Sequence, residues 1–484
     1  MKRPSRHNNK SFVQEMKNRS KAVAGVSVLI LFSFAAMRAE AQQRHEFTIA
    51  EAVELAYKNV IDVKNRELDL RIQEAMNKEI LGQALPQISG VAGTQYYFKL
   101  PQFLFPDATS TAVYQILKDE GVQGSSGPIT KVPEPSLFPV SLQQPWNANF
   151  GVTLTQLLFQ PDVFVGLQAR ATSITFAKQN IELAKEDVKD SAYKRYYAVL
   201  IAQKQLEFLN DGVKRIEKLV RDNEAMYQQG FVEKLDVERA QVQLSNLRTA
   251  QTSLKNAIFM SYAALKFALG IPQADTVVLK DTLSIDAVKE GILDDEFRYE
   301  NRKEYQLLQT GMELQRLDLK RYRLGYIPTV SLSGNYARQG MSDKFIFSKN
   351  ETDFWYNTGY VGLNISVPLF DGLQRRYKVK QAELKLEQAQ NNLTNLERAI
   401  DFQKTVSLQS LKDALLNLDE QQRNMALAEK VYNTTKRKFE EGVGSSFDII
   451  QAENDLQTSQ SNYFQALYNA TIARVNYFRA IGKL

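Results

Sequence analysis

Hydrophobic and polar residues alternate one by one in four short segments of this chain. The alternation is clear at residues 149–158, 329–336 and 360–369, and residues 87–98 follow it more weakly. A period of two is typical of a β-strand with one apolar and one polar face. The pattern therefore predicts four strands, at about residues 87–98, 147–159, 329–340 and 356–370.

Two much longer segments follow a helical period instead. Residues 373–441 contain no Gly or Pro, and residues 167–229 contain a single glycine, Gly212. Apolar residues recur there every three or four positions, as at Leu209 and Val213, which is coiled-coil spacing. Helices in globular proteins average about 11–12 residues, whereas the longer of these segments would reach roughly 100 Å. The chain is therefore predicted to be mainly α-helical, with unusually long helices.

The order of elements occurs twice, and in each copy a shorter helical segment, predicted at about residues 49–83 and 294–323, precedes the strands. The offset between Asn59 and Asn301 is 242, and the same offset separates Pro86 from Pro328. Later in the chain the offset is 212, and the pairs at that offset are Gly230 and Gly442, Asp236 and Asp448, and Gly270 and Gly482. Prolines before strands and glycines at turns keep these offsets, which indicates an internal duplication.

The offset falls because the first copy contains an additional segment at about residues 100–146. Pro, Gly and Ser interrupt this segment repeatedly, which excludes a central strand or a long helix and predicts an exposed outer loop. The sequence then divides into a leader, a first repeat, a linker and a second repeat, at residues 1–41, 42–270, 271–293 and 294–484.

The leader has the three parts of a secretory signal peptide. Seven basic residues precede an apolar run at residues 22–36, and Ala39 and Ala41 are the small residues at which a signal peptidase cleaves. The leader holds eight of the 61 Lys and Arg residues but two of the 55 Asp and Glu residues, so the mature chain is nearly neutral. Nucleic acid is therefore not a predicted partner.

Enzyme chemistry has no candidate residues in this sequence. There is no Cys, and the two His residues are His7 in the leader and His45 directly after it. No nucleophile with a base, no group of metal ligands and no phosphate-binding loop can be assembled from the remaining residues. The sequence predicts no enzyme, no cofactor and no metal site.

Four strands are too few to close a membrane barrel, which takes about eight. An open sheet edge cannot face lipid, because each unpaired backbone group costs several kcal/mol there. If the strands cross a bilayer, several chains must share one barrel, with Val, Leu and Ile toward lipid and Ser, Thr and Asn toward the lumen. The alternation by itself fits a half-buried strand of a soluble sheet equally well.

Motifs around the helical turns resemble the TolC-type outer-membrane efflux protein family. The second copy has the spacing of the family's helix-turn-helix signature at Phe439, Gly442, Asp448, Ala452 and Leu456. The first copy repeats it at Tyr227, Gly230, Asp236, Ala240 and Leu244. Residues 85–89 and 327–331 resemble the family's helix-to-strand junctions, and residues 367–372 resemble its strand-to-helix junction. The resemblance covers about residues 47–484.

This resemblance implies a homotrimer in the outer membrane of a Gram-negative bacterium. Its fold would be mainly α with a membrane β-barrel: four strands per subunit form a shared 12-stranded barrel, the long coiled-coil helices form a periplasmic tunnel, and residues 271–293 belong to an equatorial region. The implied function is a passive duct of a tripartite efflux system, docked to a periplasmic adaptor protein and an inner-membrane RND or ABC transporter. The alternatives are the duct of an ABC-type protein secretion system and, from another class, a non-pore periplasmic coiled-coil scaffold.

The resemblance also assigns candidate sites at the two helical turns. Adaptor-docking tips are implied at Gly230, Phe231, Val232, Gly442, Val443 and Gly444, and a pore constriction at Asp236 and Asp448. Left-handed glycines that end a helix, and carboxylates near a helix N-terminus, explain the same residues without any docking or gating. The family's second acid is Gln451 here, and its tyrosine is Phe439, so we expect a less charged constriction.

Overall fold

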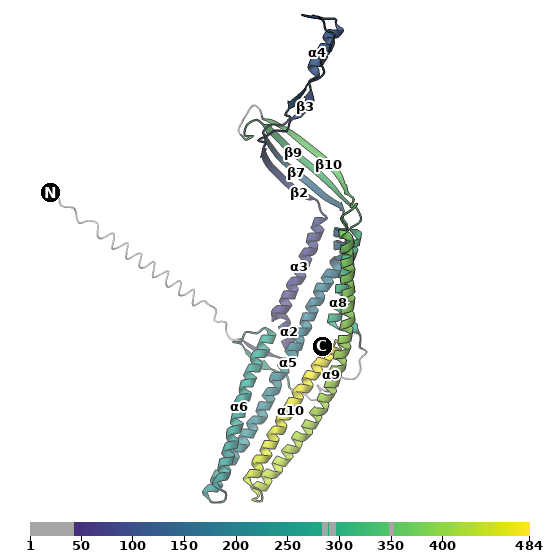
Figure 1. Cartoon of the computed structure of the whole chain (residues 1–484). Coiled ribbons are helices and arrows are strands. Elements are labelled where there is room, and N and C mark those ends of the chain that lie inside the picture. Colours follow the sequence, from purple (N-terminus) through teal and green to yellow (C-terminus); the bar gives the residue numbers. More distant parts are fainter. Residues whose placement is uncertain (1–42, 283–288, 290–296, 348–352) are drawn as a thin grey trace, which may run out of the picture. The chain divides into compact units, whose positions relative to one another are not determined.

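The computed structural model describes residues 43–282, 289, 297–347 and 353–484 (Figure 1). The predicted leader, residues 1–41, and residues 283–288 and 290–293 of the predicted linker lie outside the described residues. The chain divides into two compact units, of which the first comprises residues 1–68, 179–306 and 395–484 and the second comprises residues 69–178 and 307–394. The longest helices run from one unit into the other.

Long helices dominate the chain. In order, the elements outside the second unit's sheet and insert are β1 (Arg44–Phe47), α2 (Ile49–Asn59), α3 (Ile61–Gln83), α5 (Pro161–Gln228), α6 (Lys234–Leu269), β8 (Thr276–Leu279), the short 3-10 helix η1 (Tyr299–Asn301), α8 (Lys303–Leu324), α9 (Gln374–Glu440) and α10 (Ser446–Ala480). Helices α5 and α9 contain 68 and 67 residues, so the prediction of unusually long helices is confirmed. Strands β1 and β8 pair in parallel beside α2. Within the described residues, none of the helices combines the length and apolar character that a membrane-spanning helix requires.

The duplication extends to the backbone. The first helix of each copy is interrupted, because Val60 and its counterpart Arg302 both have an extended backbone, at ψ 127° and 126°. A glycine in the left-handed conformation packs against each interruption: Gly270 (φ 65°) against Asn59, and Gly482 (φ 74°) against Asn301. The helix expected at about residues 49–83 is therefore divided at Val60, and in the second copy the described residues before Arg302 form only the short 3-10 helix η1.

Four antiparallel strands form the sheet of the second unit, as predicted. They are β2 (Gln87–Tyr96), β7 (Trp146–Phe159), β9 (Thr329–Ser342) and β10 (Phe354–Ser366), in the order β10-β9-β7-β2 (Figure 1). The central pair, β7 and β9, joins the two copies along almost their whole length, with Trp146 opposite Ser342 and Thr155 opposite Ser333. Strands β2 and β10 are the edges of this sheet.

The register of the sheet separates an apolar from a polar face. Directly paired residues lie on the same face, and one face collects residues such as Ile88, Leu154, Val330, Leu363 and Ile365. The opposite face carries hydroxyl and amide side chains, several of which bond across strands: Ser89 with Thr153 at 2.6 Å, Asn364 to Ser333 at 2.8 Å, and Tyr356 to Gln339 at 2.6 Å. That polar face carries no charged residue within the paired positions of the four strands.

The outer insert, residues 99–145, contains short elements of its own. They are β3 (Phe103–Pro106), α4 (Ala108–Asp119), β4 (Gln123–Gly124), β5 (Gly127–Pro128) and β6 (Leu137–Val140). Strands β3 and β6 form one antiparallel pair, and β4 and β5 form another. Asp107 caps α4, since its side chain accepts hydrogen bonds from the backbone N–H groups of Thr109 and Ser110. A stretch interrupted by proline can still form such a short, capped helix, so the segment is more ordered than an irregular loop.

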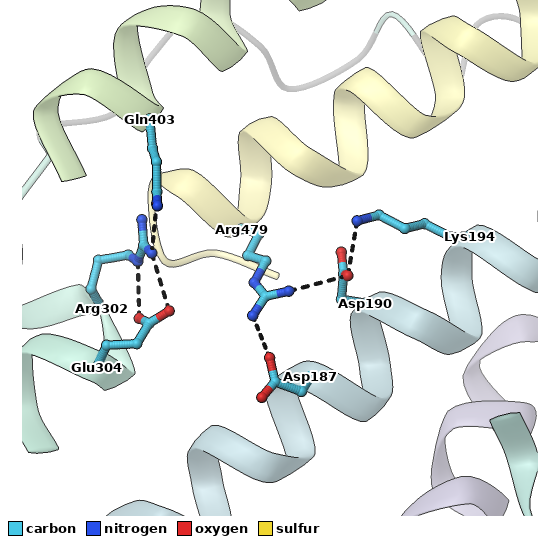
Figure 2. A network of polar contacts seen from close by, with 7 residues as sticks. All are labelled: Asp187, Asp190, Lys194, Arg302, Glu304, Gln403 and Arg479. Carbon is cyan, nitrogen blue, oxygen red and sulfur yellow. Dashed lines mark hydrogen bonds and ion pairs between the residues drawn. The ribbon is translucent and has the colours of Figure 1, made fainter. Parts of the chain in front are cut away.

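Apolar clusters and ion pairs hold the helices of the first unit together. One cluster joins α2, α5 and α6 around Tyr196, and a second joins α5, α6, α9 and α10 around Ile216 and Leu456. Figure 2 shows a polar network beside them, in which Arg479 of α10 bridges Asp187 and Asp190 of α5. Arg302, which is almost fully buried, donates to Glu304, to Gln403 of α9 and to the carbonyl of Ala480. Each of these arginines thus joins segments that are far apart in the sequence.

Candidate functional site

The turns between α5 and α6 and between α9 and α10 lie at the same end of the first unit (Figure 1). At the first turn the Phe231 N–H donates to the Met226 carbonyl at 2.8 Å, and the Gly230 N–H donates to the Tyr227 carbonyl at 3.0 Å. This pair of bonds is the Schellman motif that ends a helix, and it requires a left-handed residue, here Gly230 at φ 77°.

The second turn repeats this geometry in the second copy. The Val443 N–H donates to the Lys438 carbonyl at 2.9 Å, the Gly442 N–H donates to the Phe439 carbonyl at 3.0 Å, and Gly442 has φ 78°. Gly444 differs from Gly442, because a Cβ there would lie 3.0 Å from the backbone nitrogen of Phe439. A side chain at Gly444 would therefore crowd the end of α9.

The predicted tip residues present apolar side chains to solvent. Phe231 is 76% exposed and Val443 is 75% exposed, while Val232 and Gly444 are half-buried. Neither Phe231 nor Val443 belongs to the apolar cluster that packs the four helices nearby. The structure thus places the predicted tip residues together at one end of the unit, with one large apolar side chain uncovered on each turn.

The two predicted constriction acids have different surroundings. Asp448 is the third residue of α10 and forms a capping box with Ser445: the Ser445 N–H donates to the Asp448 carboxylate, and the Asp448 N–H donates to the Ser445 hydroxyl, both at 3.2 Å. Asp236 lies in the first turn of α6, whose N-terminal Glu233 makes no side-chain capping bond. Asp236 is half-buried, and its backbone carbonyl accepts a hydrogen bond from the Asn223 side chain at 3.3 Å.

Asn223 links the two turns and was not predicted. Its side chain is fully buried on α5, and its Nδ2 donates both to the Asp236 carbonyl on α6 and, at 2.6 Å, to the Ser446 hydroxyl on α10. In the sequence, Asn223 follows the apolar residue Val220 by one helical turn. This spacing is only a weak sign of burial, since most polar residues in a long helix face solvent. The partners could not be identified from the sequence, because both lie on other helices.

An ion pair between a half-buried arginine and a fully buried glutamate joins α5 to α10. Arg215 of α5 donates two hydrogen bonds to the Glu453 carboxylate of α10, at 2.8 and 2.7 Å, and its guanidinium stacks 5.1 Å from the Tyr432 ring centroid of α9. Gly212 leaves room for this pair, because a Cβ there would lie 3.0 Å from the Glu453 carboxylate. The only available sequence signal was Glu453 itself, a charged residue within the apolar stripe of Ile449 and Leu456.

Burial changes the ionisation of this cluster. Desolvation raises the pKa of the Glu453 carboxyl above its usual value in spite of its bonds to Arg215. Desolvation likewise raises the pKa of Tyr432 to about 12. The same desolvation opposes the charge of Arg215, but the Glu453 carboxylate outweighs it and raises the pKa of the guanidinium. The described residues also contain no group of three acidic or histidine side chains placed to hold a metal ion.

Comparison with known proteins decides which fold family this arrangement represents. The family model described as "Outer membrane efflux protein" matches residues 142–271 and 313–483, which include both turns and more than half of the chain. This chain belongs to the outer membrane efflux protein family. The resemblance to TolC-type proteins is thereby confirmed, and with it the outer-membrane location and the prediction that the protein is not an enzyme.

Similar proteins come from several bacteria. The outer membrane protein TolC of Vibrio cholerae is 22% identical over 69% of this chain and 76% of its own length. The proteases secretion protein PrtF of Dickeya chrysanthemi is 19% identical over 69% of this chain and 72% of its own length. Among solved structures, the CmeC outer membrane channel of Campylobacter jejuni has the same fold, with a TM-score of 0.65 and 16% identity over 90% of this chain and 85% of that one.

Proposed function

We propose that three copies of this chain form the duct of an efflux system, through which compounds cross the outer membrane passively. The observation that carries this proposal is the antiparallel sheet with edges at β2 and β10. Successive strands alternate in direction, so β10 of one copy and β2 of the next run antiparallel and can continue the same ladder. Because open edges cannot face lipid, further copies must close the sheet.

Three copies fit a duct better than two. Two copies would give an eight-stranded barrel, whose interior is filled by its own side chains. Three copies give twelve strands and a wider lumen, with the apolar face of the sheet toward lipid and the uncharged hydroxyl and amide face toward the lumen. On the helices, Phe259, Phe267, Phe402 and Leu416 are 67–79% exposed in a single chain, and neighbouring copies would cover them.

The mass and heat stability of the purified protein test this assembly. We expect the detergent-solubilised protein to have three times the mass of one chain and to migrate differently in gels before and after heating. The leader should be absent, so that mass spectrometry finds Gln42 at the N-terminus. A soluble monomer would contradict the duct and favour the periplasmic scaffold instead.

The tips are the proposed docking surface for a periplasmic adaptor protein, which connects the duct to an inner-membrane RND or ABC transporter. The uncovered side chains of Phe231 and Val443 support this assignment, because each is an apolar anchor on a rigid, hydrogen-bonded turn. The chain contains no Cys, so a single Cys at position 231 or 443 can be cross-linked selectively in cells. We expect an adduct with a periplasmic protein from both positions, and adducts from neither would contradict docking.

The proposed constriction lies just inside the tips, at Asp236 and Asp448. Three copies would bring six carboxylates to one level of the tunnel, which would favour cations and restrict the opening. Asp448 already caps its own helix, whereas the Asp236 carboxylate makes no such cap, so Asp236 is the stronger candidate for facing the lumen. Conductance of the Asp236→Asn channel in planar bilayers tests this: we expect reduced cation preference, and an unchanged preference would contradict the assignment.

Protein secretion is the second candidate function. The relative in Dickeya chrysanthemi is named a proteases secretion protein, and its similarity to this chain is close to that of the Vibrio cholerae TolC protein. A deletion strain separates the two functions. Loss of tolerance to small toxic compounds with normal protein secretion supports efflux, and the converse supports a secretion duct.

A further inference from the structure

The outer insert leaves its apolar side chains uncovered. Every residue from 99 to 145 is at least partly exposed. Its exposed large apolar residues are Phe103, Leu104, Phe105, Val113, Tyr114, Ile116, Val122, Leu137, Phe138 and Leu142. Proteins rarely expose contiguous apolar surface of this kind unless another surface covers it.

The β3–β6 pair is apolar on both faces. Its register places Phe103 opposite Val140 and Phe105 opposite Phe138 on one face, and it places Leu104 opposite Pro139 and Pro106 opposite Leu137 on the other. An isolated two-stranded pair is marginally stable in water at best. Pro106 and Pro139 lack a backbone N–H, which hinders the addition of a further strand at the edges. A partner must therefore pack on the faces of this pair.

We propose that the β3–β6 pairs of neighbouring copies pack on one another at the outer end of the duct. This inference rests on the proposed trimer. The insert starts shortly after Tyr96, the last residue of edge strand β2, and β2 is the strand that the next copy's β10 would join. Each insert is thus tethered beside the next copy, at an effective concentration of roughly millimolar.

The charge of the insert and its position outside the family match favour a second copy of this chain over a different partner. The insert contains three basic and four acidic residues, so copies of it repel one another weakly. The family model begins to match at residue 142, so residues 99–141 lie outside the surface that the family model describes. The packing would therefore be a feature of this chain that adds contacts to the barrel closure.

Photo-cross-linking in whole cells tests the proposal. The photoreactive residue p-benzoylphenylalanine replaces Phe105 in chains of two different lengths that are expressed together. We expect irradiation to join long and short chains at more than ten times the yield obtained with the same probe at Ser125, an exposed polar position between β4 and β5. The Leu104→Ser/Phe138→Ser variant should lower the Phe105 yield, and deletion of residues 123–128 should leave it unchanged.

The trimer is measured in the same samples, which separates the two proposals. An assembled trimer whose Phe105 probe joins a different protein, joins lipid or forms no adduct overturns the packing of the inserts and leaves the duct intact. Absence of the trimer overturns the duct, and the inference falls with it. An adduct between long and short chains in an assembled trimer supports both.

Discussion

At the scale of single residues, two glycines allow the last helix of each copy to end in close contact with the first helical segment of the same copy. Gly270 and Gly482 combine a positive φ with close contact to the backbone of Asn59 and Asn301. A Cβ would lie 2.9 Å from the Asn59 carbonyl carbon and 2.5 Å from the Asn301 oxygen. Substitution at either position must therefore strain the backbone and also displace the opposing chain.

We predict that Gly482→Ala destabilises the protein by about 2–3 kcal/mol, since a strained φ costs about 1–3 kcal/mol and the clash adds to it. The measurement is the thermal unfolding midpoint of the detergent-solubilised protein. Gly82→Ala in α3 is the control, because a Cβ there meets nothing within 4 Å and alanine favours a helix. Equal midpoints for the two variants would contradict this account.

A second residue-scale prediction concerns the Arg215–Glu453 pair. Removal of one partner from a fully buried ion pair leaves an uncompensated charge, which costs about 3–5 kcal/mol, and the partial exposure of Arg215 reduces that cost here. Glu453→Leu should therefore lower the unfolding midpoint more than the double variant Arg215→Met/Glu453→Leu, in which no charge remains. A lower midpoint for the double variant than for Glu453→Leu would mean that the Glu453 carboxylate does not stabilise the charge of Arg215.

Glu304 gives a prediction for the dependence of stability on pH. Burial acts to raise its pKa, but the two hydrogen bonds from Arg302 outweigh burial and hold the pKa below its usual 4.5. Folded Glu304 thus binds a proton less readily than unfolded Glu304, so it stabilises the fold above pH 4.5 and loses this contribution as the pH falls further. We expect Glu304→Gln to reduce the drop in unfolding midpoint between pH 5 and pH 3, and an unchanged drop would argue against it.

At the scale of elements, the two helical hairpins present matching turns with different surfaces. Both turns have the same hydrogen bonds at equivalent positions of the two copies, but one displays Phe231 and the other Val443. The duplicated backbone thus keeps its geometry while the exposed side chain changes. Grooves around a trimeric tunnel would then alternate between two kinds.

Docking at the tips can be tested by substitution of the two exposed side chains, with the glycines that the turns require left unchanged. Phe231→Glu/Val443→Glu should reduce efflux more than tenfold, because two apolar anchors are replaced by charge, while the trimer still assembles. Gln229→Glu is the control, since it adds a charge at an exposed tip position without removing an apolar side chain. Tolerance of the host to toxic compounds is the readout, and wild-type tolerance in the double variant would exclude docking through these residues.

At the scale of the whole molecule, the proposed barrel places adjacent residues of one strand in opposite environments, lipid and the lumen. Leu363 lies on the apolar face of β10 and Asn364 on the polar face, and both are exposed in a single chain. Leu363→Lys should cost about 2–4 kcal/mol at the bilayer midplane and reduce the amount of trimer in the outer membrane. Asn364→Lys should leave that amount nearly unchanged, and equal loss for both variants would mean that the two faces are not separated by a membrane.

The hydrophobic pattern by itself determined the kind and order of the main elements. Periods of two and of three to four residues identified the four strands and the long helices, because these periods follow from backbone geometry within one segment. Constant offsets identified the duplication and the turn glycines, since a left-handed turn accepts few residues other than glycine. Positions such as Gly230 and Gly442 could thus be predicted from the sequence.

The tertiary structure alone decided which distant residues meet. The pairing of β7 with β9, the bridge of Asn223 to Ser446 and the Arg215–Glu453 pair each join a residue of the first copy to a residue of the second. No local period encodes such contacts, because they depend on which helix faces and strand edges of distant segments pack together. The break at Val60 and the short helix α4 in the proline-rich insert were missed for the related reason that packing and capping, rather than propensity, determine where such elements end.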